Sequence, residues 1–117
     1  MTQHDLLSPE RWSAFSVDQQ VLMIGNEMNR ASKLLNHADR NLLTNSYERV
    51  LHLTDLTIQA NPRKGLRREM LRWRDLVAEL YLGAEGNPSA HAAAFRSLLT
   101  FTPMASRQRV YLKALVS

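Results

Sequence analysis

The side chains that most often carry out chemistry in proteins are few in this sequence, and their spacing does not fit a metal or catalytic site. The chain has no cysteine, which excludes thiol nucleophiles, disulfides and thiolate metal ligands. Its four histidines lack the H-E-x-x-H and E-x-x-H spacings that put two ligands on one helical face. Glu48 and His52 are four residues apart, a spacing more typical of a surface hydrogen bond. We therefore expect no enzymatic activity, no metal and no cofactor.

One pair, Arg30 and His37, has the spacing of a known catalytic motif. The two residues are seven positions apart, which on one helix would place them on the same face. This R-x6-H spacing resembles the motif of the HEPN superfamily, small helical bundles that often dimerise and cleave RNA. The resemblance implies that Arg30 would bind phosphate and that His37 would transfer a proton.

A second resemblance lies at residues 16–24, with the sequence SVDQQVLMI. This segment looks like the capped start of the second helix of the flagellin export chaperones, which are small cytoplasmic helical bundles. The resemblance implies a class of protein in which a bundle binds a helix of another chain in an apolar groove.

The elements expected to position these residues are helices, because only 4 Gly and 4 Pro interrupt a chain rich in good helix formers. Ser16 and Gln19 form a capping box, which predicts that a long helix begins there. Apolar residues then recur at alternating steps of four and three, as on one face of a helix. They are Val17, Val21, Ile24, Met28, Ala31, Leu35 and Ala38.

Two more long helices follow. Asp39 can cap the second, and Asn61-Pro62 reads as the start of the third, with proline at its first position. Gly83 or Gly86 can end the third helix in a left-handed conformation. The expected core faces are Leu43, Tyr47, Val50, Thr54 and Thr57, and then Leu66, Met70, Trp73, Val77, Leu80 and Ala84.

Shorter helices are predicted at two cap-plus-proline starts, Asn87-Pro88 and Thr102-Pro103, and a similar start at Ser8-Pro9 predicts a short turn through Trp12 and Phe15. The sequence shows no alternating strand pattern of useful length. It therefore predicts a single all-α domain over residues 1–117, an up-down antiparallel helical bundle of three long helices plus one or two short C-terminal helices. Five residues are expected in its core: Leu35, Tyr47, Leu51, Val77 and Leu80.

The cellular location follows from what the sequence lacks. The first residues do not combine a basic start with an apolar run, and no stretch approaches the roughly 18 apolar residues of a membrane span. We expect a cytoplasmic protein that does not contact a membrane.

The whole chain has a net charge of +4 and an isoelectric point near 10.0. Its positive charge is concentrated in one stretch of the sequence. Cations at the start of a helix face the positive end of its dipole, so they call for an anion, a carboxylate or full solvation. This cluster is the candidate site for an anion or a partner. Its members are Arg63, Lys64, Arg67, Arg68, Arg72 and Arg74.

The main hypothesis is a non-enzymatic helical-bundle interaction module that self-associates or binds a protein partner. The three apolar stripes and four large aromatic residues are expected to exceed what four packed helices can bury. The alternative is an RNA-binding or HEPN-like ribonuclease bundle that uses the Arg63–Arg74 basic face, and nucleic acid is the less favoured partner. The four aromatic residues are Trp12, Phe15, Trp73 and Tyr81.

Overall fold

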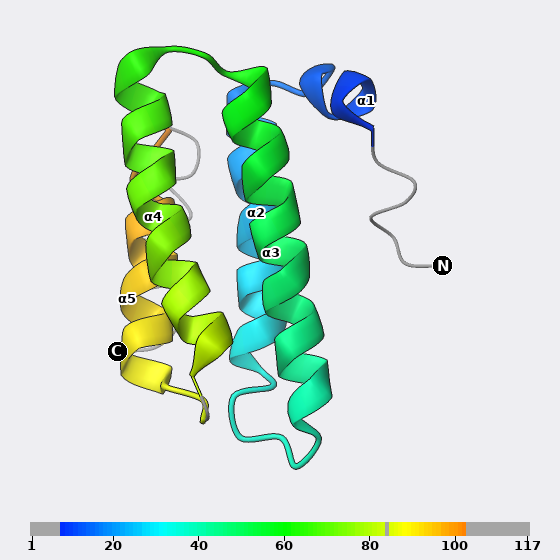
Figure 1. The fold of residues 1–117 in the computed structure, drawn as a ribbon, viewed down its shortest axis with the longest axis vertical. Helices are drawn as coiled ribbons and strands as arrows, with labels where there is room; N and C mark the ends of the chain where they lie inside the picture. Colours follow the sequence, from blue (N-terminus) through cyan, green and yellow to red (C-terminus); the bar gives the residue numbers. More distant parts are fainter. Residues whose placement is uncertain (1–7, 84, 103–117) are drawn as a thin grey trace.

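The computed structural model of this protein describes residues 8–83 and 85–102, and the regular secondary structure of this part is helical throughout (Figure 1). The helices pack on one another, which confirms the predicted all-α bundle. The helix expected after Thr102-Pro103 lies outside the described residues. The helices are α1 (Pro9–Ser13), α2 (Val17–Ser32), α3 (Arg40–Ala60), α4 (Lys64–Leu82) and α5 (Pro88–Leu98).

Side-chain caps begin four of these helices at the residues predicted from the sequence. The Ser16 hydroxyl accepts from the Gln19 backbone N–H, while the Gln19 side chain accepts from the Ser16 N–H. Ser8, Asp39 and Asn87 cap α1, α3 and α5 with a single side-chain oxygen each. These bonds satisfy backbone donors that a helix leaves free at its start.

The predicted start of the third long helix at Asn61-Pro62 is wrong, because Asn61 ends α3 instead. Its side-chain amide donates to the Thr57 carbonyl oxygen at 2.9 Å and to Gln20 Oε1 at 2.7 Å. The asparagine is therefore used to join the last turn of α3 to α2. α4 begins at Lys64, with Arg63 as a cap that makes no side-chain hydrogen bond.

The end of the first long helix also differs from the prediction. α2 ends at Ser32 rather than near Ala38, and the following residues form turns. Leu35 stays in the core at 9% exposure although its backbone is not helical, so the apolar rhythm continues past the helix. Neither Gly83 nor Gly86 has the left-handed conformation expected at the end of α4.

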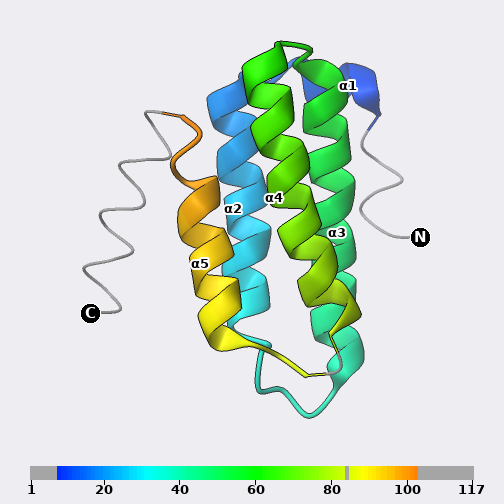
Figure 2. The same ribbon diagram turned by 60° about the vertical axis from the view of Figure 1, so that its left-hand side comes forward.

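The long helices lie side by side and successive ones run in opposite directions in Figures 1 and 2. α3 packs between α2 and α4, α5 packs against both α2 and α4, and the short α1 lies against α3. The connection before α5 touches the turn after α2. The contact is so close that a Cβ atom at Gly86 would collide with the Leu35 carbonyl oxygen. No helix among residues 8–83 and 85–102 has both the length and the apolar character needed to cross a bilayer.

The core lies between the helices and contains most of the predicted stripe residues. Of the five residues chosen from the sequence, Leu35, Tyr47 and Val77 are buried, whereas Leu51 and Leu80 are only partly buried at its edge. Trp12 and Trp73, which were expected to add surplus apolar surface, are buried at 0% and 1% exposure.

Candidate functional site

The predicted basic cluster occupies the first half of α4. Six exposed residues of this helix line one shallow depression on the side opposite the buried Met70 and Val77. We call this set the outer face of α4. It consists of Lys64, Arg67, Arg68, Leu71, Arg72 and Asp75.

Arg74 belongs to the same stretch of sequence but has a different role. Its guanidinium group forms two hydrogen bonds with the Asp55 carboxylate of α3, at 2.5 and 3.2 Å. These bonds raise the pKa of Arg74 above its ordinary value. Arg74 therefore fastens α4 to α3. Arg63 is exposed at the cap position, one residue before the outer face begins.

Most cations of the outer face have no carboxylate partner within the described part of the chain. Arg72 lies 3.5 Å from Glu69, and both side chains are more than half exposed. Lys64, Arg67 and Arg68 form no ion pair there. An exposed pair such as Arg72–Glu69 contributes about 0–1 kcal/mol, so the charge of this face remains available to a ligand.

The charge of α4 changes sign along the helix. Its first half carries the cations, whereas Asp75 and Glu79 are the acidic residues of its second half, where no Lys or Arg follows Arg74. Both carboxylate-bearing residues are exposed. α4 is therefore a helix with a basic half and an acidic half on its solvent side.

Large apolar side chains are also exposed on α4. Leu71 is 44% exposed at the centre of the outer face, and Leu82 is 79% exposed near the end of the helix. Both lie off the apolar stripe that packs into the core, and Leu71 is flanked by Arg67 and Arg68 one turn before it and by Asp75 one turn after it. Single exposed leucines are ordinary on protein surfaces, so Leu71 becomes a candidate contact only together with the charged residues around it.

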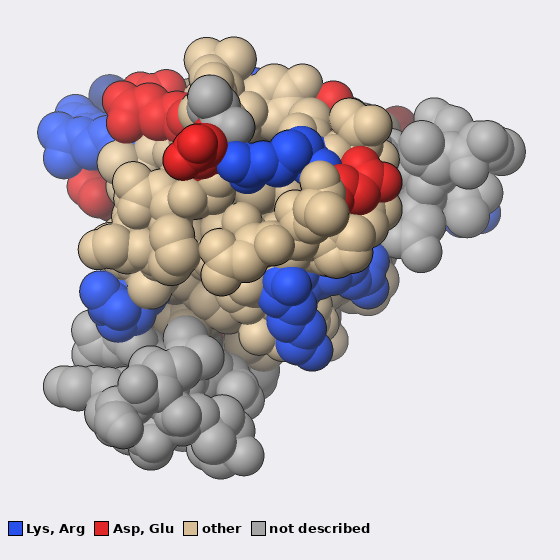
Figure 3. Space-filling model, turned by 90° about the horizontal axis from the view of Figure 1, so that it is seen from below, with Lys and Arg blue, Asp and Glu red and all other residues tan. Residues whose placement is uncertain are grey.

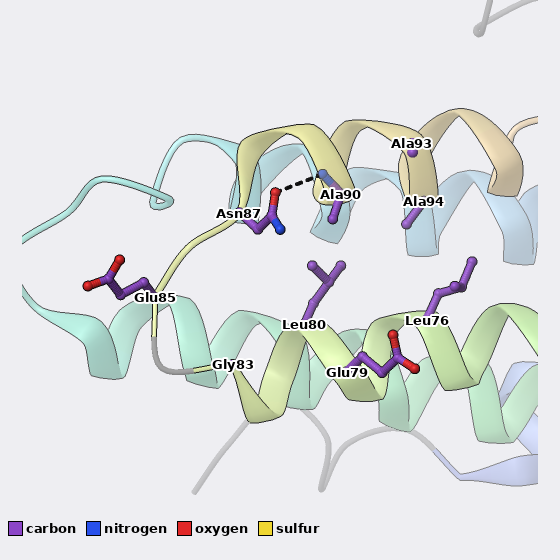
Figure 4. Close-up of a pocket in the computed structure, with 9 residues that line it drawn as sticks. All are labelled: Leu76, Glu79, Leu80, Gly83, Glu85, Asn87, Ala90, Ala93 and Ala94. Carbon is purple, nitrogen blue, oxygen red and sulfur yellow. Dashed lines mark hydrogen bonds between the residues drawn. The ribbon is translucent and has the colours of Figure 1, made fainter.

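A groove of about 410 Å³ separates α4 from α5. Leu76 and Leu80 extend from α4 toward α5, and Ala90 and Ala94 extend from α5 toward α4 (Figure 4). Alanines on α5 leave this space open because their side chains are short. The groove is apolar, and its polar lining residues are Glu79, Glu85 and Asn87.

The candidate catalytic pair from the sequence does not share a helical face. Arg30 lies on α2 and donates to Glu27 Oε1 at 3.0 Å, whereas His37 lies beyond the end of the helix. His37 Nδ1 accepts a hydrogen bond from the backbone N–H of Asp39 at 2.9 Å. The expectation of a common face is wrong because α2 ends at Ser32. Within the described residues, no group of three potential metal ligands occurs.

His91 is buried at 1% exposure among α2, α3 and α5, a role the sequence did not reveal. Its Nε2 lies 2.9 Å from the Met28 carbonyl oxygen, and its Nδ1 lies 2.8 Å from the Tyr47 hydroxyl. Because a carbonyl can only accept, Nε2 carries the hydrogen and Nδ1 accepts from Tyr47. Burial lowers the pKa of His91 and raises that of Tyr47 to about 12. This is an interior structural contact, not an accessible acid–base pair.

The lower end of the bundle differs from the outer face of α4. There, acidic and basic side chains lie beside one another in several small groups, and uncharged residues cover most of the surface between them (Figure 3). On this face, the described residues form no continuous basic surface.

The sequence prediction found the cations of the outer face but missed its leucine, Leu71. The predicted core stripe already indicated that Leu71 lies off the buried side of the helix, because Met70 and Val77 belong to that stripe. Charged residues opposite a buried stripe are ordinary on a surface helix, so the leucine was the feature to notice there.

Comparison with known proteins finds no protein family, no curated protein and no solved structure that matches this chain.

Proposed function

We propose that this protein is a non-enzymatic helical-bundle interaction module that binds a protein surface through the outer face of α4. The observation that carries the proposal is the exposure of Leu71 beside cations of which three, Lys64, Arg67 and Arg68, have no carboxylate partner in the described part of the chain. Burying this leucine against a partner would remove apolar surface from water, and carboxylates of the partner would neutralise Lys64 and Arg68.

A protein partner fits this face better than RNA does. Single-stranded RNA is commonly bound by aromatic side chains that stack on bases. Trp73, the aromatic residue within the basic stretch, is buried and donates its indole N–H to the Ala94 carbonyl oxygen at 2.7 Å. The acidic Asp75 and Glu79 would also repel phosphates at the end of any path along α4.

The separation of Arg30 and His37 supports the non-enzymatic proposal. A nuclease of the HEPN type would need phosphate binding and proton transfer at one place. Here Arg30 is paired with Glu27, and His37 accepts from the backbone in a turn.

The experiment compares the wild type with Leu71→Lys and with a matched control, Leu42→Lys. Leu42 lies on α3 and is 40% exposed, close to the exposure of Leu71. Tagged protein is purified from native extract with and without nuclease treatment, and the mass of purified protein is measured by sedimentation. We expect the wild type either to self-associate or to copurify with another polypeptide. This association should survive nuclease treatment, be lost in Leu71→Lys and be retained in Leu42→Lys.

Two results would count against the proposal. Equal behaviour of the two variants would show that the outer face of α4 is not a docking surface. Submicromolar binding of RNA by the wild type would favour the RNA-binding alternative if the affinity also became less sensitive to salt when Arg67, Arg68 and Arg72 are replaced together.

A further inference from the structure

Four exposed charges of α4 are arranged around Leu71 with opposite signs at nearly equal distances on its two sides. Arg68 lies three residues before Leu71, and Asp75 lies four residues after it. Lys64 lies seven residues before it, and Glu79 lies eight after it. All four charged residues are exposed. Because steps of three and four residues return to the same side of a helix, they share the solvent side with Leu71.

This arrangement is complementary to itself when the helix is reversed. If a second α4 lies antiparallel, with a twofold axis beside Leu71, Arg68 of each copy faces Asp75 of the other. Lys64 of each copy then faces Glu79 of the other. A twofold interface uses the same patch on both copies, so every such contact occurs twice. A parallel arrangement would instead place Lys64 and Arg68 next to their own equivalents, whereas the antiparallel one does this only for Arg72, which is paired with Glu69 of its own copy at 3.5 Å.

The face is not covered by other described helices. α3 lies on the side of α4 that carries Arg74 and Tyr81, since these bond to Asp55 and Glu48 of α3. α5 lies on the side of Trp73, whose N–H bonds to α5. Leu71 and its charged neighbours therefore point away from both.

From this geometry we infer that the partner of the outer face is a second copy of this chain, paired antiparallel along α4 with Leu71 at the centre. The inference rests on the proposed function, since it names the occupant of the same surface. The two copies of Leu71 bury each other near the axis. The charge pairs fix the orientation and register of the pairing. Because the charge pairs are exposed, the dimer weakens as salt rises.

The test exchanges charges at one pair of positions. Arg68→Glu puts two acidic residues opposite each other, and Asp75→Arg puts two basic residues opposite each other. Each variant alone should raise the dimer dissociation constant about tenfold or more at low salt, measured by sedimentation. An equimolar mixture should form a heterodimer within about threefold of the wild-type constant, because both charge pairs are then attractive: the two substituted positions face each other with reversed sign, and the unchanged Asp75 and Arg68 form the natural pair.

A matched control separates the pairing from a change in net charge. Arg96→Glu alters the net charge as Arg68→Glu does, but on the exposed side of α5. It should leave the dissociation constant nearly unchanged. Failure of the mixture to recover dimerisation, or equal weakening by Arg96→Glu, would overturn the inference.

The orientation can be tested by disulfide formation, because the natural chain has no cysteine. A disulfide requires Cα atoms less than about 7 Å apart. Leu71→Cys, next to the axis, should give a covalent dimer under mild oxidation. Leu82→Cys is eleven residues from Leu71 and would lie roughly 30 Å from its equivalent in an antiparallel pair, so it should stay uncrosslinked. Efficient crosslinking of both variants would indicate parallel pairing and overturn the antiparallel arrangement.

The outcomes also distinguish this inference from the proposed function. A wild type that stays monomeric at all concentrations overturns the second copy as occupant. If it still captures another polypeptide in a manner sensitive to Leu71→Lys, the docking surface stands. If it captures none, both fail.

Discussion

The stability of this protein should depend on pH through His91. Burial lowers the pKa of this side chain below its ordinary value of 6.5. In the unfolded chain His91 takes up a proton near pH 6.5, while in the folded protein it stays neutral to lower pH. The unfolded state therefore binds more protons in that interval, so the free energy of unfolding falls as pH drops below 6.5. The contribution of neutral His91 is complete above that pH.

The size of the effect follows from one proton and two hydrogen bonds. A single group can change the free energy of unfolding by at most about 1.4 kcal/mol per pH unit. At about pH 8, His91→Leu should cost about 1–3 kcal/mol, because the buried Tyr47 hydroxyl loses its acceptor. Below pH 6.5 the variant should lose stability less steeply than the wild type, because the titrating group is gone.

The assay is urea denaturation followed by circular dichroism between about pH 8 and about pH 5. Subtracting the curve of His91→Leu from that of the wild type removes contributions from the other histidines. The double variant Tyr47→Phe with His91→Leu should lose less free energy of unfolding than Tyr47→Phe and His91→Leu lose together as single variants, by about 0.5–3 kcal/mol. Parallel pH curves for wild type and His91→Leu would refute the reasoning.

Three substitutions test the packing in the same assay. Gly86→Ala should lower the free energy of unfolding by about 1–3 kcal/mol, because its new methyl group meets the Leu35 carbonyl oxygen; an unchanged midpoint would contradict that contact. Gly25→Ala should raise it by about 0.5–1 kcal/mol, since the added Cβ atom makes only ordinary contacts at 3.6 and 3.7 Å within α2; a loss would show that α5 packs more tightly there. Ser46→Ala should raise it by up to about 1 kcal/mol, because the buried hydroxyl has no hydrogen-bond partner in the described part of the chain; a clear loss would reveal a partner.

The helices were predictable from the sequence because two local signals agree, the apolar rhythm and the side-chain caps. Ser16, Asp39 and Asn87 begin helices where their side chains reach the next free N–H groups. Asn61 carried the same local signal, but its amide bonds to Gln20, which is 41 residues away in sequence. A long-range partner of this kind cannot be read from neighbouring residues.

The candidate site was only half predictable for a related reason. The count of cations is a property of the sequence, so the basic half of α4 was found. Whether a cation is available to a ligand depends on what packs beside it. Arg74 is not available, because it forms an ion pair with Asp55 of α3. Leu71 was missed although the predicted core stripe of Met70 and Val77 already indicated that it lies off the buried side; how exposed it is depends on the helices that pack beside α4.

The position of α5 has a consequence for how the chain is made. Protein synthesis proceeds from the N-terminus, and Phe95 and Leu99 are the residues that cover Gly25 on α2. The surface of α2 around Gly25 therefore stays uncovered while α3 and α4 are already complete and able to pack. During this interval the nascent chain contains α1 to α4 with an open apolar side on α2, and chaperones or aggregation compete with the arrival of α5.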